Sequence, residues 1–473
     1  MARTLLAVLL ASALIAAALP AAAGEATPTD LSAIDQLIGV EMKAAHIPGV
    51  SLGIVRDGEV IYTKGYGEAS PGRPMLASTP MVLGPISEAV TAAAVLQLAE
   101  AGKLDLDAPV TRYMPWFRLG GSAGSDGGIT VRHLLAHTSG LTAADSSRPL
   151  LDDGTQTLEE SVYSLRDVAP AGPPGEAFRP SSLNYDLLGL VVQTVSGQPF
   201  GEYLRTKVFT PLQMKRSFTD QAPAIREFMA EGYQIWLGLA TPSAAPYLKN
   251  SVPSRYIIST AEDMARFVAA GLKGSTAETG FTAREMAGLQ TLTRGGSTPS
   301  FQSQLVWIPD VRTGFVLLTN GQHPLSGAAM ARMSEGIAAA LSGRPVAVPS
   351  WWHHSAWVLY DVAYLGASGL VIWSLESIRR WRQRLAAAAG RAWQLGLIAV
   401  GLHLALAAGL TFGVPLLAGG SWANLQLFAP DLGRLAAGAV IANFIGAGLR
   451  VWITITTPHK RIDTIEKESA LAG

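Results

Sequence analysis

The sequence predicts an α+β domain, an antiparallel sheet flanked by helices, followed by a region of three transmembrane helices. Hairpin patterns stand near both ends of the stretch 26–345 and helical patterns lie between them, which is typical of this fold class. After Pro349 the composition changes to long apolar runs of the kind that cross membranes. Only 15% of all residues are charged, against about 25% in a typical soluble domain, so part of the chain is expected to lie outside water.

The overall composition excludes several classes of function. With 36 basic and 36 acidic side chains, the chain lacks the basic surface of a nucleic-acid binder. It has no cysteine, which excludes disulfides, a thiol nucleophile and cysteine-ligated metal sites. We therefore expect no nucleic-acid partner, no cofactor and no metal. Hydrophobic residues make up 49% of the chain, which argues against disorder.

The N-terminal segment has the pattern of a secretory signal peptide over residues 1–23. Arg3 precedes an apolar run from Leu5 to Leu19, and an Ala-x-Ala step at the end of the segment predicts cleavage near Ala23. The alternative is an uncleaved N-terminal anchor. In either case the domain over 26–345 is expected to be exported.

The elements of this domain follow from periodicity and from turn residues. Asp57-Gly58 between two β-type runs is a strong hairpin signal. Pro85 at the first position and Gly102 just past the end delimit an Ala-rich helix. In chain order, the patterns predict a helix over 32–45, strands over 50–55 and 60–66, helices over 85–101, 130–136 and 184–195, strands over 301–308 and 313–319, and a closing helix over 325–341.

Three apolar stretches, 356–375, 393–417 and 435–453, predict transmembrane helices, because each is long enough to cross a hydrocarbon core of about 30 Å. Arginines between Arg379 and Arg384 separate the first two stretches, and Lys460 opens a basic tail over 457–473. No Lys or Arg lies at 418–432. Since positive charge marks the cytoplasmic side, we expect a multi-pass protein of the cell membrane, in contact with the lipid bilayer, with its N-terminal domain on the outer (periplasmic or extracellular) face.

Polar and aromatic residues of the membrane region suggest an anchor. Trp351, Trp352 and Trp357 fit an aromatic belt at the outer interface. Asp361 is expected to pair with Arg434 at the outer start of the third stretch. The charges of the three stretches do not share one depth, so we do not expect a transport function.

A series of short motifs stands in one order along the exported domain. The motifs are IPG at 47–49, DG at 57–58, KGYG at 64–67, GKLDLDAPV at 102–110, ITVRHLLAHTSGL at 129–141, NYDLLG at 184–189, VSG at 195–197, PLQM at 211–214, STAEDM at 259–264 and PSFQS at 299–303. Together they resemble the serine β-lactamase and penicillin-binding-protein family, on the class C β-lactamase and D-Ala-D-Ala carboxypeptidase branch. The resemblance covers roughly residues 31–342 and implies that family's fold.

The resemblance also implies a chemistry that this chain lacks. Members of the family use a Ser-x-x-Lys motif at a helix start, a Tyr-x-Asn loop and a Lys-Thr-Gly or His-x-Gly strand to attack lactam, ester or peptide carbonyls. Here Pro85 stands at the nucleophile position and Glu88 at the lysine position. Proline has no nucleophilic atom, and glutamate reverses the charge that would help to ionise one.

The other two motifs are degenerate as well. Pro180, Ser181 and Ser182 stand where Tyr-Ser-Asn is expected, and Arg294 stands at the His or Lys position. A guanidinium stays protonated, so it can bind an anion but cannot act as a base. Reading Ser182-Leu183-Asn184 as a Ser-x-Asn motif requires a two-residue shift of register against Tyr185. No lysine has a serine three residues before it, so we predict no catalytic residue.

The replaced residues predict a different role for the cleft. Glu88 in the first helical turn complements the positive helix end, and we expect it to form an ion pair with Arg294 that closes or reshapes the pocket. The alternative is that both side chains face solvent. His133 and His137 are interpreted as packing and hydrogen-bonding residues. Hydroxyl and charged groups that could line a carboxylate-binding pocket belong to Ser87, Glu88, Ser181, Ser182, Arg294 and Ser297.

The function predicted from these features is that of a membrane-anchored, exported pseudoenzyme. It would bind or scaffold at the cell wall without acyl transfer, and its ligand would be a cell-wall peptide, another small molecule or a protein. The alternative is an active serine hydrolase of the β-lactamase, carboxypeptidase or esterase type with a non-standard site.

Overall fold

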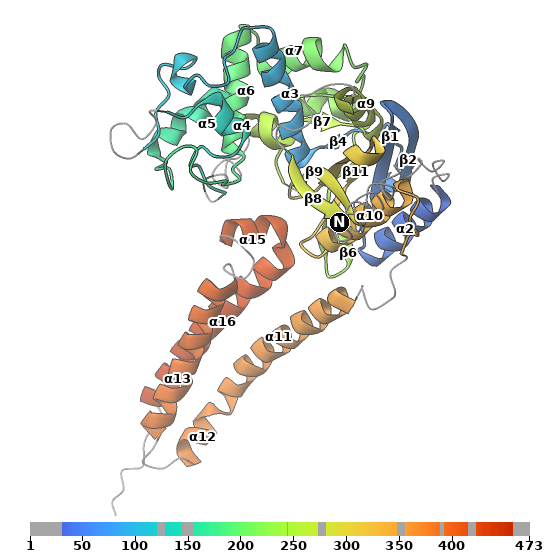
Figure 1. The fold of residues 1–473 in the computed structure, drawn as a ribbon. Coiled ribbons are helices and arrows are strands. Elements are labelled where there is room, and N and C mark those ends of the chain that lie inside the picture. The colour runs from blue at the N-terminus through green and yellow to red at the C-terminus, as the bar shows by residue number, and fades with distance from the viewer. Residues whose placement is uncertain are drawn as a thin grey trace, which may run out of the picture.

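The structure of this protein is a computed structural model, drawn in Figure 1. It describes residues 31–120, 128–143, 145, 155–243, 245–272, 281–347, 355–387, 392–414 and 422–456. The predicted signal peptide, Trp351, Trp352 and the predicted tail over 457–473 lie outside the described residues.

A seven-stranded antiparallel sheet forms the centre of the N-terminal domain, as the sequence predicts. Both predicted hairpins are present, and they lie side by side because β1 pairs with β11. The strand order is β3-β2-β1-β11-β10-β9-β8. The strands are β1 (Gly49–Arg56), β2 (Glu59–Ser70), β3 (Arg73–Pro74), β8 (Thr282–Met286), β9 (Leu289–Ser297), β10 (Gln302–Ile308) and β11 (Thr313–Thr319). Two smaller sheets join β4 (Met81–Val82) to β7 (Ile258–Ser259), and β12 (Gly321–Gln322) to β5 (Tyr233–Trp236) and β6 (Leu239–Pro242).

Helices cover both faces of the central sheet. Alternate residues of β11 supply both cores, since Phe315 and Leu317 pack on one side while Val316 and Leu318 pack on the other. The first core is closed by α2 (Leu31–Ala44) and α10 (Ser326–Leu341). On the other side lie α9 (Ala261–Leu272) and a helical region (Figure 1). That region contains α3 (Ser87–Glu100), α4 (Val131–Leu135), α5 (Leu158–Tyr163), α6 (Leu183–Ser196), α7 (Phe200–Leu204) and α8 (Gln221–Arg226).

Helix α3 begins two residues later than the proline signal predicts. Pro85 lies in a 3-10 turn, η1 (Gly84–Ile86), and the α-helix starts at Ser87. Gly84, at φ 57°, turns the chain into η1 from the left-handed region. The C-terminal signal is confirmed, because Gly102 follows the helix at φ 67°.

The hairpin of β8 and β9 is absent from the sequence prediction. Its two-residue turn is Ala287-Gly288, and both residues have positive φ angles of 48° and 67°. Turns of this kind usually have the sequence Asn-Gly or Asp-Gly, and alanine at the first position removes that signal. Strand β8 is also largely exposed, so it lacks an apolar alternation.

The C-terminal region is helical, and two of its stretches are long and apolar enough to cross a membrane. These stretches are Trp393–Gly413 and Pro430–Thr456. The first predicted span forms a helix, α11, but it is not among the two stretches found in the described residues, so three clear spans are not found. The helices are α11 (Ser355–Arg379), α12 (Trp381–Ala387), α13 (Ala392–Ala408, extended by a π-helical turn at Gly409–Gly413), α15 (Trp422–Phe428) and α16 (Pro430–Thr456).

Two expectations for the membrane region are wrong. The guanidinium of Arg434 lies over the Trp236 ring, 4.4 Å from its centroid, and forms no ion pair with Asp361 within the part of the chain that the structure describes. Trp357 is only 7% exposed and packs against the rings of His46 and His323, with centroid distances of 5.3 and 4.7 Å. Both side chains contact the N-terminal domain, and local sequence does not encode such long-range packing.

A buried ion pair between α2 and α10 gives a test of this fold. Nε and Nη2 of Arg332 each donate to a carboxylate oxygen of Glu41 at 2.8 Å, and the Glu41 side chain is fully buried. Substituting Arg332→Ala leaves a buried carboxylate without its counter-charge, so we expect a loss of about 3 kcal/mol in the free energy of unfolding. Urea unfolding of a protein of residues 26–345 measures it.

The matched control is Arg312→Ala. Arg312 forms an ion pair of the same length with Asp57, but both side chains are exposed, and such pairs contribute less than about 1 kcal/mol. Equal losses in the free energy of unfolding in the two variants would contradict a stabilising role of the buried pair between Glu41 and Arg332.

Candidate functional site

The turn at the start of α3 is where the family's nucleophile would stand, and it is closely covered by β9. A Cβ atom built on Gly296 would lie only 2.7 Å from Cγ of Pro85. Gly296 also has φ 157°, so glycine is required there both for space and for backbone conformation. The pyrrolidine ring of Pro85 therefore packs directly against the strand that carries Arg294.

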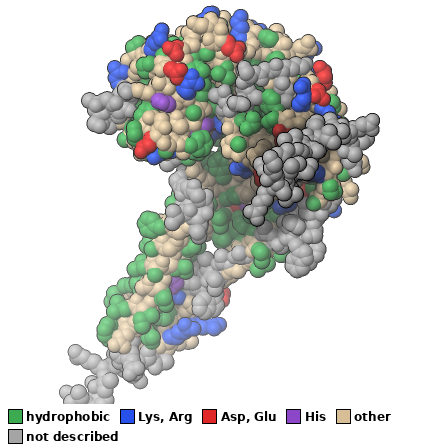
Figure 2. All heavy atoms as spheres, in the orientation of Figure 1, with side chains coloured by type: hydrophobic (Ala, Val, Ile, Leu, Met, Phe, Trp, Pro, Cys, Tyr) green, Lys and Arg blue, Asp and Glu red, His purple; other side chains and the backbone are tan. Residues whose placement is uncertain are grey.

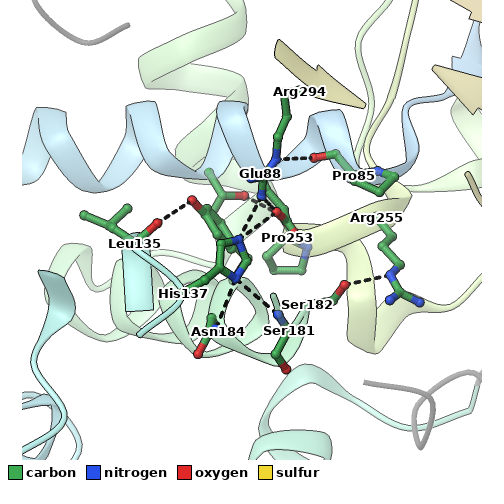
Figure 3. Close-up of polar contacts among 12 residues, drawn as sticks. Pro85, Glu88, Leu135, His137, Ser181, Ser182, Asn184, Pro253, Arg255 and Arg294 are labelled. Carbon is green, nitrogen blue, oxygen red and sulfur yellow. Dashed lines mark hydrogen bonds and ion pairs between the residues drawn. The ribbon is translucent and has the colours of Figure 1, made fainter. Parts of the chain in front are cut away.

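Glu88 and Arg294 form a buried ion pair across this contact, which confirms the pairing expected from the sequence (Figure 3). Their side chains are 5% and 10% exposed, so the alternative of two solvent-facing charges is wrong. Nε of Arg294 also donates to the carbonyl oxygen of Pro85, at 3.4 Å. Burial lowers the pKa of Arg294 to about 10, which leaves the guanidinium protonated at neutral pH and unable to act as a base.

His137 is the third member of this cluster, a buried hydrogen-bonding residue as expected from the sequence. The backbone N–H of Ser181 donates to Nδ1 at 3.2 Å, which assigns the ring proton to Nε2. Nε2 lies 3.4 Å from a carboxylate oxygen of Glu88 and 3.1 Å from Nη2 of Arg294. Burial lowers the pKa of His137 to about 4. The ring is thus neutral, and it has no free lone pair with which to accept a proton from a nucleophile.

Two serine hydroxyls at the predicted pocket positions accept hydrogen bonds from groups that cannot act as a base. Ser87 is fully buried, and its Oγ accepts a hydrogen bond from the backbone N–H of Ile257 at 3.2 Å. The Oγ of Ser182 accepts from Nε of Arg255 at 2.8 Å. Neither donor can take a proton from a serine.

Two of the predicted pocket residues do not line the cleft. Ser87 points into the core, because it occupies the inward side of the first turn of α3. Ser297 lines an adjoining cavity beside α10, together with Gln302 and Ser334. Glu88, Pro180, Ser181, Ser182 and Arg294 do come together around one cleft.

Asn184 is a structural residue, which argues against the shifted Ser-x-Asn register. Its side chain is fully buried, and Oδ1 accepts a hydrogen bond from Oγ of Ser139 at 2.5 Å. Its Nδ2 lies 3.2 Å from Nδ1 of His137. The amide therefore supports the histidine from below (Figure 3) and does not face a ligand.

The chain also contains one Gly-x-Ser-x-Gly sequence, at Gly120–Gly124. The nucleophile elbow that this pattern describes lies between a strand and a helix. The residues before it form no strand, and Gly120 donates its N–H to the carbonyl oxygen of Val168 in a loop contact. Residues 121–127 lie outside the described residues.

The cleft is a cavity of about 460 Å³ with a positive lining. Three guanidinium groups, those of Arg255, Arg284 and Arg294, face it, and Glu88 is the one acidic residue of its described lining. The full lining is Pro85, Glu88, His137, Ala143, Phe178, Pro180, Ser181, Ser182, Arg255, Thr282, Arg284, Thr293, Arg294, Gly295 and Gln304.

Arg255 and Arg284 are the cleft residues that the sequence analysis missed. Arg284 lies on the unpredicted strand β8, is exposed, and forms no ion pair with any acidic residue that the structure describes. Arg255 lies in a π-helical turn, η8 (Val252–Tyr256), beside the buried Asp186, whose pKa burial raises to about 7. Neither arginine belongs to a motif, so only the tertiary structure brings them to the cleft. Among the described residues, no group of three or more His, Asp or Glu side chains is placed to hold a metal.

The neutral His137 predicts a pH dependence of stability. Its folded pKa of about 4 lies below the ordinary value of 6.5, so between these values the unfolded chain binds a proton that the folded chain does not. The contribution of the neutral ring to the free energy of unfolding is fully present above pH 6.5. It falls by about 3 kcal/mol as the pH drops to 4. Urea unfolding of residues 26–345 at several pH values measures this slope.

His137→Asn is the comparison variant. Asparagine tolerates the left-handed backbone at φ 54° and offers an acceptor to the Ser181 N–H, but it does not titrate. The variant is expected to lose less stability than the original chain between pH 6.5 and 4. If the free energy of unfolding falls equally with pH in the two proteins, the pH dependence does not come from His137.

Comparisons with known proteins agree with the fold described above. The Beta-lactamase family model matches residues 34–340. Protein flp of Staphylococcus aureus (strain MW2) is 31% identical over 237 residues, which are 50% of this chain and 47% of that protein. Esterase EstB of Burkholderia gladioli is 33% identical over 195 residues, 38% of this chain and 50% of the esterase. The chain thus spans about half the length of these curated relatives.

Solved structures show the same likeness at the level of the fold. The octameric penicillin-binding protein homologue from Pyrococcus abyssi has a TM-score of 0.59 and 24% identity, covering 67% of this chain and 78% of its own. The D-amino acid amidase from Ochrobactrum anthropi has a TM-score of 0.57 and 21% identity, covering 64% and 97%. With the family match extending from α2 to α10, this chain belongs to the beta-lactamase family, among the serine β-lactamase and penicillin-binding-protein-like proteins.

Proposed function

We propose that this protein is a catalytically inactive member of its family, anchored in the cell membrane, whose exported domain binds an anionic ligand. The observation that supports the proposal is the start of α3, where Pro85 stands at the nucleophile position and Glu88 forms an ion pair with Arg294. Acyl transfer in this family needs a hydroxyl next to a proton acceptor. In the cleft, the hydroxyl of Ser182 meets a guanidinium, and His137 is neutral with its accepting nitrogen occupied.

The charge of the cleft supports a ligand with a carboxylate or a similar anion. The sequence suggested Arg294 as the binding residue, but its charge is already balanced by Glu88. Arg255 and Arg284 therefore carry the excess positive charge. Charge-assisted hydrogen bonds from guanidinium groups to carboxylates are among the stronger ones, and a cavity of about 460 Å³ lies within the usual range for small ligands. A cell-wall peptide with a free C-terminus has suitable chemistry.

The surface of the C-terminal helices supports membrane anchoring. Figure 2 shows apolar side chains gathered on the helices that extend away from the exported domain. Soluble proteins rarely expose apolar patches of this extent. The exposed residues also include a row on α11, which supports a third membrane helix. They are Val358, Leu359, Val362, Leu365 and Ile372 on α11, Leu397, Ile398 and Leu402 on α13, and Ile441, Phe444, Ile445 and Ile455 on α16.

The second candidate function is an active hydrolase with a non-standard site. It is favoured by the similarity to Esterase EstB, but a shared fold does not establish a shared reaction. Replacing a single nucleophile commonly costs orders of magnitude in rate, and here the positions of the nucleophile, the lysine and the tyrosine are all changed.

Labelling with a fluorescent penicillin, followed by intact-mass measurement, distinguishes the two functions. The full chain in detergent is expected to show no mass increase, while a competent family member labelled in parallel acquires one penicillin. A stoichiometric adduct, or ester hydrolysis that is abolished by changing one cleft residue, would establish the hydrolase instead.

The same preparation tests the ligand class. A peptide ending in D-Ala-D-Ala is expected to bind reversibly, and Arg284→Gln should weaken it about tenfold, the effect of losing one charge-assisted hydrogen bond. The same peptide with a C-terminal amide lacks the carboxylate, so it should bind no better to the original chain than to the Arg284→Gln variant. Arg312→Gln, which changes an exposed arginine whose partner is Asp57, is the matched control. Equal binding of acid and amide would contradict anion recognition.

The proposed topology is testable because the chain has no cysteine of its own. Single cysteines at Lys103, in an exposed turn of the exported domain, and at Gln383, on α12, report on the two sides. A membrane-impermeant maleimide is expected to label Lys103→Cys in intact cells and Gln383→Cys only after permeabilisation. Labelling of both sites in intact cells would overturn the orientation.

A further inference from the structure

The hairpin of β5 and β6 lies beside the first residues of α16 and points along that helix. Nε2 of Gln234, on β5, donates to the carbonyl oxygen of Leu427, in α15, at 2.7 Å. Two residues further along β5, the ring centroid of Trp236 lies 4.4 Å from the guanidinium of Arg434. Arg434 comes four residues after Pro430, the first residue of α16, which is about 6 Å along the helix. The contacts of β5 therefore move from α15 into α16 as the strand approaches its turn.

The turn of this hairpin also lies near the start of α11. A Cβ atom built on Gly238, in the turn, would lie 3.3 Å from the His46 ring. That ring is 5.3 Å from the ring of Trp357, the third residue of α11. Figure 1 shows β6 at the side of the N-terminal domain nearest to α11. The turn is thus flanked by the starts of α11 and α16, the two helix ends that the proposed topology places at the outer membrane interface.

The turn exposes apolar side chains and has an unusual sequence. Leu237 is 42% exposed and Leu239 is 71% exposed. Leu237 and Gly238 both have positive φ angles, of 48° and 75°. Asn or Asp usually stands first in such a turn, because either residue tolerates the left-handed backbone better than leucine does. A leucine at this position is therefore unfavourable both for the backbone and for hydration, which favours a role in contact with an apolar phase.

The hairpin also lacks the charged side chains that usually protect an exposed sheet edge. Strand β6 is an edge strand of its sheet, and all four of its residues are exposed. No Lys, Arg, Asp or Glu occurs over residues 232–248. Edge strands in contact with water commonly carry charges, and β8, at the edge of the central sheet, has Arg284 and Glu285. Because a charge is costly to remove from water, a charge-free hairpin suits a surface that lies against lipid.

We propose that the β5–β6 hairpin inserts into the interfacial layer of the outer leaflet, with Leu237 and Leu239 in contact with lipid. The ring of Trp236, beside Arg434 in the first turns of α16, fits the preference of tryptophan for this layer. The inference rests on the proposed membrane anchoring, which brings the hairpin to the bilayer, and goes beyond it. The helices tether the domain, whereas a second contact with the bilayer fixes the orientation of the domain above the membrane.

Quenching by lipid-bound nitroxide tests the proposal in the full chain, which has no cysteine of its own. Leu239→Cys is labelled with an environment-sensitive fluorophore and reconstituted into phosphatidylcholine vesicles, with or without phosphatidylcholine that carries a nitroxide near its head group. The control is Ile61→Cys, on β2. Ile61 has the same exposed fraction as Leu237, but it lies beside the Arg56 end of β1, whereas β12, the partner of β5, follows the opposite end of the sheet.

We expect the nitroxide to remove more than half of the fluorescence at position 239 and almost none at position 61, because an interfacial hairpin lies at the depth of the quencher. Equal quenching at the two positions would overturn the proposal. A blue-shifted probe at position 239 that the nitroxide does not quench would overturn it as well, since the hairpin would then be covered by protein, such as a second copy of this chain.

Leu237→Asp tests whether the exposed leucines hold the hairpin in lipid. Aspartate tolerates a left-handed backbone, so the variant is expected to fold, and its charge should reduce quenching at position 239 at least twofold. Ile61→Asp should leave that quenching unchanged. Quenching that is unchanged by Leu237→Asp would contradict the proposed contact. Since maleimide labelling at positions 103 and 383 measures anchoring independently, an unquenched hairpin in a chain of the expected topology contradicts only this inference.

Discussion

The buried ion pair between Glu88 and Arg294 is the interaction on which the cleft depends. It joins the first turn of α3 to strand β9, that is, the helical region to the central sheet. Neither charge could remain in this position alone, since an uncompensated buried charge costs several kcal/mol. Each charge can therefore be buried only because the other is present. His137 completes the cluster as a neutral ring, because it is buried and its Nδ1 is held by the backbone of Ser181.

The cleft combines the family's architecture with charged side chains that pair with one another. The sheet, α3 and the loop at 180–182 surround a cavity of about 460 Å³, and Glu88 at the lysine position pairs with Arg294 at the third motif position. Arg255 and Arg284 also line the cleft and make its described lining positive. This separation of scaffold and chemistry is why family membership by itself does not assign an activity.

Local signals in the sequence determined the two hairpins, the Ala-rich helix, the order of the family landmarks and the loss of the nucleophile, because turn residues, periodicity and motif spacing act between neighbours in the chain. The pairing of Glu88 with Arg294 was also predictable, since the family's fold brings those two positions together. The tertiary structure alone decided that Ser87 faces the core, that Arg434 contacts Trp236 rather than Asp361, and that Arg255 and Arg284 line the cleft. These outcomes depend on packing between segments far apart in the chain, and neither residue type nor local spacing records which distant side chain will be a neighbour.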